Sequence, residues 1–251
     1  MDLNEFFTEH NKIALAFSGG ADSSYLLYAA VSCGADVQPY YVKSQFQPEF
    51  EHEDALKLAH GLGLTLREIS LDVLQFDEVT ANPANRCYYC KKRIMGAVRA
   101  AAKADGYDTM LDGTNASDDG GDRPGMRVLT EEGILSPLRL CGITKAELRR
   151  LSHEAGLFTW DKPAYACLAT RVPTGERITA EKLRAVEESE SCLFALGFTD
   201  FRVRLRGGAA LLQFTARQHE RAENELDAIK AELSKYFDTV MLDPQPREES
   251  K

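Results

Sequence analysis

The sequence lacks an excess of positive charge and lacks any apolar run long enough to span a bilayer. Its 251 residues carry 30 Lys and Arg against 39 Asp and Glu, a formal net charge of −9. This balance argues against a broad basic surface for tRNA or DNA, so we expect no nucleic-acid partner. No apolar segment approaches the roughly 18 residues that cross a membrane. The acidic start, Met1–Glu5, is unlike a signal peptide. We therefore expect no membrane partner and a cytoplasmic location.

A second C-x-x-C pair is also missing. Cys87 and Cys90 form one such pair and Cys167 stands apart from it, which excludes a four-cysteine zinc site. In a reducing compartment, cysteines are better interpreted as metal ligands, redox groups or buried thiols than as disulfides. Three thiolates would leave one iron of a 4Fe-4S cluster without a protein ligand. The alternative is three ordinary buried cysteines, which is also our expectation for Cys33, Cys141 and Cys192.

A Walker motif is absent as well, because no Gly-Lys-Ser/Thr follows the glycine-rich turn near the N-terminus. Instead, the strand-like run Ile13–Phe17 leads into S-G-G-A-D-S-S and then into an apolar helix from Tyr25. Such a turn directs backbone N–H groups at an anion, and the helix N-terminus adds partial positive charge. The alternative is a chance glycine-rich turn. We expect a phosphate cradle formed by Ser18, Gly19, Gly20, Asp22, Ser23 and Ser24.

Strand-like and helix-like segments alternate along the first part of the chain. The expected strands are Lys12–Ser18, Val37–Val42, Thr65–Leu71 and Thr109–Gly113, and the expected helices follow Asp22 and span Glu49–Leu62 and Cys90–Ala104. This alternation predicts an α/β fold, with a Rossmann-like parallel sheet and helices on both faces. Ligands bind beyond the carboxyl ends of such strands. Ser18, Lys43 and Gly113 lie at these ends, so we expect them to face one pocket.

The remainder predicts a smaller C-terminal α+β domain, and we place the domains at 1–165 and 166–251. A Gly- and Asp-rich loop is expected at Ser117–Arg127, where Asp118, Asp119 and Asp122 fit a solvated acidic loop better than a metal site. Thr144 begins a capping-box pattern and a helix to about Ala155. Later expected elements are a loop at Lys162–Gly175, helices at Ala180–Leu196 and Ala216–Tyr236, and strands at Phe201–Leu205, Ala210–Phe214 and Thr239–Leu242.

Several motifs together resemble the LarE family, ATP-dependent sulfur transferases of the PP-loop superfamily. They are the cradle sequence, N-R-C-Y-Y-C-K, D-G-T-N-A-S-D, G-D-R-P-G, S-P-L followed by T-K-A-E-L-R, W-D-K-P-A-Y-A-C-L-A-T-R, and R-V-R-L-R. The cradle is shared by the whole superfamily, whereas the block Trp160–Arg171 is far more specific. The resemblance covers almost the whole chain. It implies the substrate pyridinium-3,5-biscarboxylic acid mononucleotide, whose carboxylates become thiocarboxylates in the nickel-pincer nucleotide cofactor of lactate racemase.

Two versions of this family are known. In one, a single cysteine gives up its own sulfur and becomes dehydroalanine. In the other, three cysteines hold a 4Fe-4S cluster that relays sulfide. Cys167 matches the single cysteine, and Cys87 and Cys90 are the additional pair, so the sequence resembles the cluster version. The alternatives are a sacrificial Cys167, another PP-loop enzyme such as a tRNA thiolase or an ammonia-using amide synthetase, and a non-enzymatic ATP sensor.

The resemblance also implies roles for further residues. ATP and Mg²⁺ are the expected cofactors, with Asp22 as the Mg²⁺ ligand and Lys43 and Lys91 as phosphate-binding cations. Gly113 and Thr114 are expected near the nucleoside. Guanidinium groups pair bidentately with phosphate, which favours Arg171, Arg202 and Arg204 as ligands of the substrate phosphate. A solvated strand face is the alternative for the arginines. Sulfide or a sulfur donor is the expected partner, and the resemblance implies a homo-oligomer such as a hexamer.

Overall fold

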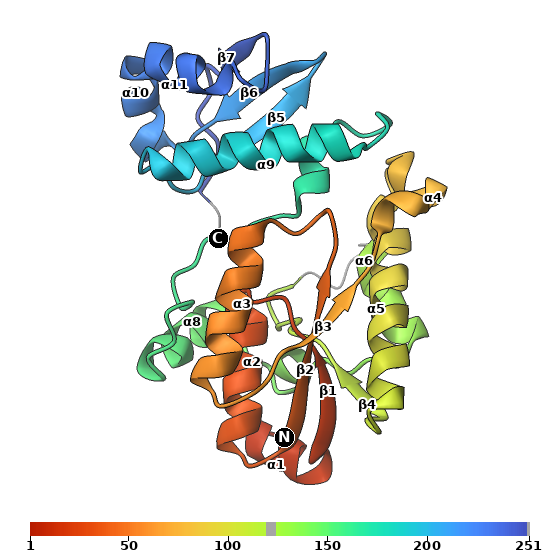
Figure 1. The fold of residues 1–251 in the computed structure, drawn as a ribbon. Helices are drawn as coiled ribbons and strands as arrows, with labels where there is room; N and C mark the ends of the chain where they lie inside the picture. The colour runs from red at the N-terminus through yellow and green to blue at the C-terminus, as the bar shows by residue number, and fades with distance from the viewer. Residues whose placement is uncertain (119–123, 250–251) are drawn as a thin grey trace. The chain divides into compact units, whose positions relative to one another are not determined.

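The computed structural model describes residues 1–118 and 124–249, and it divides the chain into two compact units (Figure 1). Unit 1 comprises Met1–Val73 and Asn85–Lys162, and unit 2 comprises Leu74–Ala84 and Pro163–Lys251. The third crossing between the units, after Lys162, lies close to the expected boundary at 165. The assignment of residues 74–84 to unit 2 differs from the expectation, because no change in composition marks that short segment.

Unit 1 is built on a parallel sheet. Within the described residues its strands are β1 (Lys12–Ala16), β2 (Asp36–Lys43), β3 (Arg67–Ser70) and β4 (Thr109–Leu111), in the order β3-β2-β1-β4. Every neighbouring pair is parallel. The chain places β2 and then β3 on one side of β1 before it crosses to place β4 on the other side. The direction in which strands are added therefore reverses between β1 and β4. The crevice beyond the carboxyl ends of these two strands is where such sheets bind ligands.

Helices cover both faces of this sheet, as the sequence predicts (Figure 1). The helices of unit 1 are α1 (Leu3–Glu9), α2 (Ala21–Ser32), α3 (Glu49–Gly61), α5 (Arg86–Ala104), α6 (Pro124–Glu131), α7 (Pro137–Leu140) and α8 (Lys145–Glu154). Ile13 and Leu15 of β1 point into a core shared with α1, α2, α3, α7 and α8, whereas Ala14 points into a second core shared with α5 and α6. This alternation follows the two-residue period of a strand.

Unit 1 has one local feature that the sequence did not predict and two that differ from the expectations. The N-terminal segment forms α1, because Asp2 and Glu5 cap the helix reciprocally, at 2.9 Å in each direction. Helix α5 begins at Arg86 rather than at Cys90, so both cysteines of the C-x-x-C pair are helical. Helix α6 starts at Pro124, inside the expected loop, because proline suits the first turn of a helix. Asp119 and Asp122 lie outside the described residues.

Unit 2 is a small α+β structure. Its sheet has the order β5-β6-β7, where β5 (Arg202–Arg206) and β6 (Ala209–Gln213) are antiparallel and β7 (Val240–Leu242) is parallel to β6. Gly207 and Gly208 both have positive φ, as a two-residue hairpin turn requires. The expected long charged helix is interrupted at Glu225. The other elements are η1 (Val73–Gln75), α4 (Asp77–Thr80), η2 (Leu168–Arg171), α9 (Ala180–Ala195), α10 (Ala216–Asn224) and α11 (Leu226–Leu233).

Asn82 joins the segment 74–84 to the rest of unit 2. Its side chain is buried and donates to the carbonyl oxygens of Val172 (3.3 Å) and Pro173 (2.8 Å). Its own carbonyl accepts from Gly175 N at 2.8 Å. The backbone of Asn82 has a φ of 53°, which asparagine tolerates better than most residues. The short segment is therefore held by specific polar bonds in addition to apolar packing.

In the described part of the chain, no helix combines the length and the apolar character that a bilayer crossing demands.

We expect Asn82→Ala to lower the free energy of unfolding by about 2–3 kcal/mol, because it orphans buried carbonyls and places alanine at positive φ. Asn82→Gly removes the same hydrogen bonds without the backbone strain, so it should be less harmful by about 1 kcal/mol. Urea unfolding monitored by circular dichroism measures both variants. An Asn82→Ala protein as stable as the wild type would contradict this assignment.

Candidate functional site

The turn between β1 and α2 is tightly constrained. Gly19 has a φ of 74°, and a Cβ on it would lie 3.0 Å from Ala55 Cβ and 3.1 Å from the Glu51 carbonyl oxygen of α3. The hydroxyls of Ser18 and Ser23 are 3.1 Å apart, and the Ser23 hydroxyl donates to the Gly20 carbonyl at 3.2 Å. The turn is thus held by α3 on one side and by its own hydroxyls on the other. It begins at the carboxyl end of β1, which is the position expected of a phosphate cradle.

The end of β4 approaches this turn so closely that only glycine fits. A Cβ on Gly113 would lie 2.9 Å from Ser23 N and 3.0 Å from Ser23 Cα, where the neighbouring atoms are backbone. A cavity of about 260 Å³ opens at this point. Its lining comprises Ala16, Ser18, Asp22, Ser23, Lys91, Met95, Asp112, Gly113, Thr114 and Asp118. Six residues predicted from the sequence therefore surround one cavity: Ser18, Asp22, Ser23, Lys91, Gly113 and Thr114.

Four of the ten residues predicted to bind ATP are not part of this lining: Gly19 and Gly20, which form the turn itself, and Lys43 and Ser24. Lys43 does not line this cavity; its ammonium contacts the Glu49 carboxylate and lies 2.9 Å from His52 Nδ1. The pKa of Glu49 is lowered by its hydrogen bond to His52 and next by Lys43. Ser24 is fully buried in α2, and its hydroxyl has no hydrogen-bond partner among the described residues. Lys43 thus lies away from the expected pocket, and the backbone N–H of Ser24 is also engaged, because it donates to Gly20 O at 3.0 Å at the start of α2.

Two ion pairs set the charge of the cavity. Lys145 Nζ, on the first turn of α8, lies 2.8 Å from both carboxylate oxygens of Asp22. Lys91 Nζ lies 3.5 Å from Asp112 Oδ2, and the same buried carboxylate accepts from the hydroxyls of Ser136 (2.6 Å) and Thr114 (2.7 Å). Sequence reasoning used Lys145 only as part of a helix-capping motif and did not single out Asp112. The T-K-A-E run contains Lys145 and the D-G-T-N run begins with Asp112, so these two runs were the signals that could have identified them.

A second, apolar pocket adjoins the first. It has a volume of about 150 Å³ and shares Ala16, Ser18 and Met95 with the polar cavity. The remaining lining residues are Phe17, Tyr40, Tyr41, Val42, Gln47, Ile94 and Val98. Burial, reinforced by Glu51 and Glu49, raises the pKa of Tyr41, and its hydroxyl has no hydrogen-bond partner in the part of unit 1 that is described. A polar cavity beside an apolar one suits a ligand with a charged end and a flat, weakly polar end.

The C-x-x-C thiols lie at the start of α5. Cys87 is exposed and Cys90 half-buried, and a spacing of three residues places both on one face of the helix. Cys167 is half-buried in unit 2, immediately before η2. All six cysteines of the chain are free, and Cys33, Cys141 and Cys192 are half-buried rather than fully buried as expected. Within residues 1–118 and 124–249, no group of three or more His, Cys, Asp and Glu side chains is arranged to hold a metal ion.

Arg171 is not on an exposed face. Its guanidinium forms a bidentate pair with Glu190, with Nε–Oε1 at 2.7 Å and Nη2–Oε2 at 3.1 Å, and both side chains are at most 2% exposed. Burial acts to lower the pKa of Arg171, but the hydrogen bond and charge of Glu190 outweigh it, and Tyr165 and Cys167 raise it further. Arg171 thus differs from the surface phosphate ligand that the sequence suggested, because its charge is already neutralised by a buried carboxylate.

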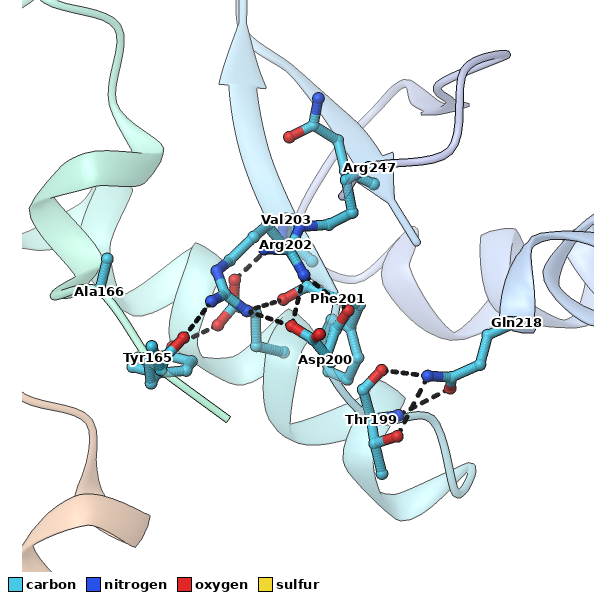
Figure 2. A network of polar contacts seen from close by, with 12 residues as sticks. Tyr165, Ala166, Thr199, Asp200, Phe201, Arg202, Val203, Gln218 and Arg247 are labelled. Atoms are coloured by element: carbon cyan, nitrogen blue, oxygen red, sulfur yellow. Dashed lines mark hydrogen bonds and ion pairs between the residues drawn. The ribbon is translucent and has the colours of Figure 1, made fainter. Parts of the chain in front are cut away.

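Arg202 and Arg204 share one face of β5, as their spacing predicts, but their environments differ. Arg202 is buried beside Tyr165 and Asp200, and Arg247 also forms an ion pair with the Asp200 carboxylate (Figure 2). Burial and the nearby Arg171 and Arg247 lower the pKa of Arg202 to about 10. Arg204 is exposed, with Nε 2.6 Å from Gln213 Oε1. Only Arg204 therefore has the exposure expected of a residue that meets a substrate from solution.

Gly113→Ala should weaken nucleotide binding at least tenfold, because the new Cβ forces the β4 end away from the backbone of Ser23. Titration with a fluorescent ATP analogue measures the change. Gly96→Ala is the matched control: Gly96 lies within α5, where an added Cβ would meet open space, so the change should leave binding unaltered and stabilise the helix by up to about 1 kcal/mol. Unchanged nucleotide affinity in Gly113→Ala would contradict a site at this cavity.

Comparison with known proteins gives several relatives, although no protein-family model matches the chain. An uncharacterized protein of Synechocystis sp. is 36% identical over 86% of this chain and 81% of its own length. Pyridinium-3,5-bisthiocarboxylic acid mononucleotide synthase of Lactiplantibacillus plantarum is 31% identical over 80% of this chain and 74% of its own. The tRNA-specific 2-thiouridylase MnmA of Thermotoga maritima is 23% identical over 58% of this chain and 52% of its own length. The chain therefore belongs to the LarE family of the PP-loop superfamily.

Proposed function

We propose that this chain is an ATP-dependent sulfurtransferase that adenylates the carboxylates of pyridinium-3,5-biscarboxylic acid mononucleotide and converts them to thiocarboxylates. The observation that carries the proposal is the polar cavity formed by the β1–α2 turn and the end of β4, in a chain 31% identical to a synthase of the corresponding bisthiocarboxylate. A phosphate cradle next to an apolar pocket fits ATP, with the base in the apolar part and the phosphates against the turn.

The chemistry explains why ATP is needed. A carboxylate is a poor electrophile, because its substitution would expel an oxide ion. When a substrate carboxylate oxygen attacks the α-phosphorus of ATP, pyrophosphate leaves and an acyl adenylate forms. A sulfur nucleophile then attacks the acyl carbon and AMP leaves with the electron pair of the broken C–O bond. The protein contributes mainly by positioning the two reactants and neutralising phosphate charge.

Each part of the cavity has a role in this scheme. The backbone N–H groups of residues 19–23, with the hydroxyls of Ser18 and Ser23, would hold the pyrophosphate. Lys91 and Lys145 supply positive charge at the cavity. Carboxylate oxygens are the ligands that Mg²⁺ prefers, and Asp22 provides two of them, both now engaged by Lys145. A Mg²⁺ ion bound there would offset phosphate charge while Lys145 turns from Asp22 toward the phosphates.

The sulfur chemistry is assigned to Cys87, Cys90 and Cys167. Three thiolates suit a 4Fe-4S cluster, and two of them already share one face of α5. Such a cluster, when bound, would supply sulfide to the acyl adenylate. The alternative is a sacrificial mechanism: Cys167 Sγ attacks the acyl carbon, a base removes the Cys167 Cα proton, and the Cβ–S bond breaks to leave dehydroalanine and the thiocarboxylate.

The compartment and partners complete the proposal. Free thiols at all six cysteines are consistent with the reducing cytoplasm, and either free sulfide or a sulfur-carrying donor would replenish the sulfur. A homo-oligomer, such as a hexamer, is part of the same proposal. A tRNA substrate is disfavoured by the net charge of −9. A gel shift with bulk tRNA at low salt would be evidence for such a substrate.

Lys91→Met should raise the KM for ATP by about 10- to 100-fold, since a charge-assisted contact contributes about 1.5–3 kcal/mol. Lys43→Met serves as the matched control. Its ammonium pairs with Glu49 outside the cavity, so its KM should stay within about twofold of the wild type. Pyrophosphate release in the presence of the dicarboxylate substrate gives both values. Equal effects of the two substitutions would contradict the position assigned to the triphosphate.

Iron analysis of anaerobically purified protein tests the sulfur chemistry. In the cluster version, about four irons per chain are expected, and Cys87→Ala, Cys90→Ala and Cys167→Ala should each lose both iron and sulfur transfer. Full activity of an iron-free Cys87→Ala protein would exclude the cluster. In the sacrificial version, one turnover lowers the mass of the Cys167 peptide by about 34 Da, the loss of H₂S, with no second cycle.

A further inference from the structure

We propose that Gln47, oriented by Ser44, is the residue that selects adenine over other bases in the apolar pocket. This inference rests on the proposed function, in which ATP is the nucleotide that the chain uses, and it names the side chain that recognises the base. No motif in the sequence pointed to either residue.

Gln47 lies in the turn between β2 and α3, where its position is well defined. Its backbone N–H donates to the Ser44 carbonyl at 3.3 Å, and Phe46, which precedes it, is buried. The turn follows the carboxyl end of β2, at the edge of the sheet where ligands bind. Gln47 is half-buried there and lines the apolar pocket of about 150 Å³. A ligand that enters this pocket therefore meets Gln47.

The Ser44 hydroxyl fixes the orientation of the Gln47 amide. Ser44 is buried, and its Oγ accepts from Phe46 N at 3.2 Å and donates to Gln47 Oε1 at 2.6 Å. A glutamine amide has two N–H donors on Nε2 and two lone pairs on Oε1, and Ser44 occupies one of these lone pairs. Nε2 forms no hydrogen bond within the described part of the chain. The amide thus offers a donor and, beside it, a remaining acceptor in a fixed arrangement.

The other polar side chains of the pocket lining are engaged or point elsewhere. The hydroxyl of Ser18 is bound within the cradle turn, and that of Tyr40 donates to Asp105 at 3.1 Å. Tyr41 packs in the core on the opposite face of the sheet, together with α3. The rest of the lining is apolar. The Gln47 amide is therefore the polar side-chain group that the described lining leaves for a base.

The apolar residues of the pocket bind a base but cannot identify it. Ile94, Met95 and Val98 of α5 and Phe17 at the end of β1 present hydrocarbon and aromatic surface. Every purine has a flat face that such surface covers equally well, because apolar contact is non-directional. Selection needs a group that reads the pattern of donors and acceptors at the edge of the ring.

A glutamine amide matches adenine and conflicts with 6-oxopurines. It donates to N7 through Nε2 and accepts from the 6-amino group through Oε1, the pairing that proteins use to read adenine in DNA. Guanine and hypoxanthine carry O6 in place of that amino group, so Oε1 would face another acceptor. Rotation of the amide by a half-turn would relieve this conflict, but the Ser44 hydroxyl would then face Nε2 and lose its acceptor. Ser44 thereby converts an amide that could pair with either base into one that selects adenine.

Nucleotide binding to the full-length chain, without the dicarboxylate substrate, tests this role. Displacement of a fluorescent ATP analogue gives the affinities for ATP, for ITP, in which O6 replaces the amino group, and for 7-deaza-ATP, in which a C–H group replaces N7. The wild type should bind ATP at least about fivefold more tightly than ITP and about threefold more tightly than 7-deaza-ATP. Gln47→Leu has a similar size without the amide, so its three affinities should agree within about twofold.

Two further variants separate recognition of the base from general damage. In Ser44→Ala the Gln47 amide is free to rotate, so the ratio of ATP affinity to ITP affinity should fall by at least about threefold, with tighter binding of ITP. A purely structural loss would weaken both nucleotides equally. Gln45→Leu is the matched control, because the Gln45 amide in the same turn is bound to Asp72 (2.9 Å) and to Val73 N (3.2 Å). Its ratio of affinities should equal that of the wild type.

Selectivity for ATP that persists in Gln47→Leu would overturn the inference, and so would a wild type that binds ITP as tightly as ATP. If Gln47→Leu does not fold, the ratio measured with Ser44→Ala decides, and an unchanged ratio overturns the inference. Failure of the proposed function gives a different result. A wild type that selects ATP through Gln47 but forms no thiocarboxylate from the dicarboxylate substrate would contradict the sulfurtransferase proposal alone.

Discussion

The close approach of the β4 end to the start of α2 is the constraint on which the candidate site depends. A Cβ at Gly113 would lie 2.9 Å from Ser23 N, so the end of β4 meets the first turn of α2 without any side chain between them. This contact exists because β4 pairs directly with β1 in the parallel sheet. It places the β1–α2 turn, the carboxylate of Asp112 and the ammonium of Lys91 around one cavity. A bulkier residue at either end would separate the groups that the ligand must bridge.

Two ion pairs are already formed at that cavity before any ligand binds. Asp22 pairs with Lys145, and Asp112 accepts from Lys91, Ser136 and Thr114. A triphosphate entering this site would bring several negative charges, for which the two ammonium groups are partners already in place. The carboxylate that Lys145 releases would then be available to a divalent cation. The ion pairs therefore hold the polar side chains in place without a ligand, and each side chain has a new partner when the ligand and its cation bind.

In unit 2, buried polar contacts restrain loops. Its buried pair, Arg171 and Glu190, is costly to desolvate and stabilises the fold only because every partner is satisfied. The Arg171 guanidinium also donates to the carbonyl of Ala166, directly before Cys167. The segment 74–84 adds to this unit through Asn82, which adopts a backbone conformation that few other residues accept. Both features restrain loops rather than extend the core.

The sequence by itself determined the α/β class, the strands of the parallel sheet, the phosphate-binding turn and the family. The first three depend on local patterns: runs of apolar residues, a capping residue, and small residues between a strand and a helix. The family rests instead on the resemblance of longer motifs such as Trp160–Arg171. Only the tertiary structure decided which charged groups meet. It pairs Lys145 with Asp22 across 123 positions of sequence, pairs Lys43 with Glu49 outside the cavity, and buries Arg171 against Glu190. Spacing along the chain carries no record of such pairs, because they form only where separate helices and strands pack together.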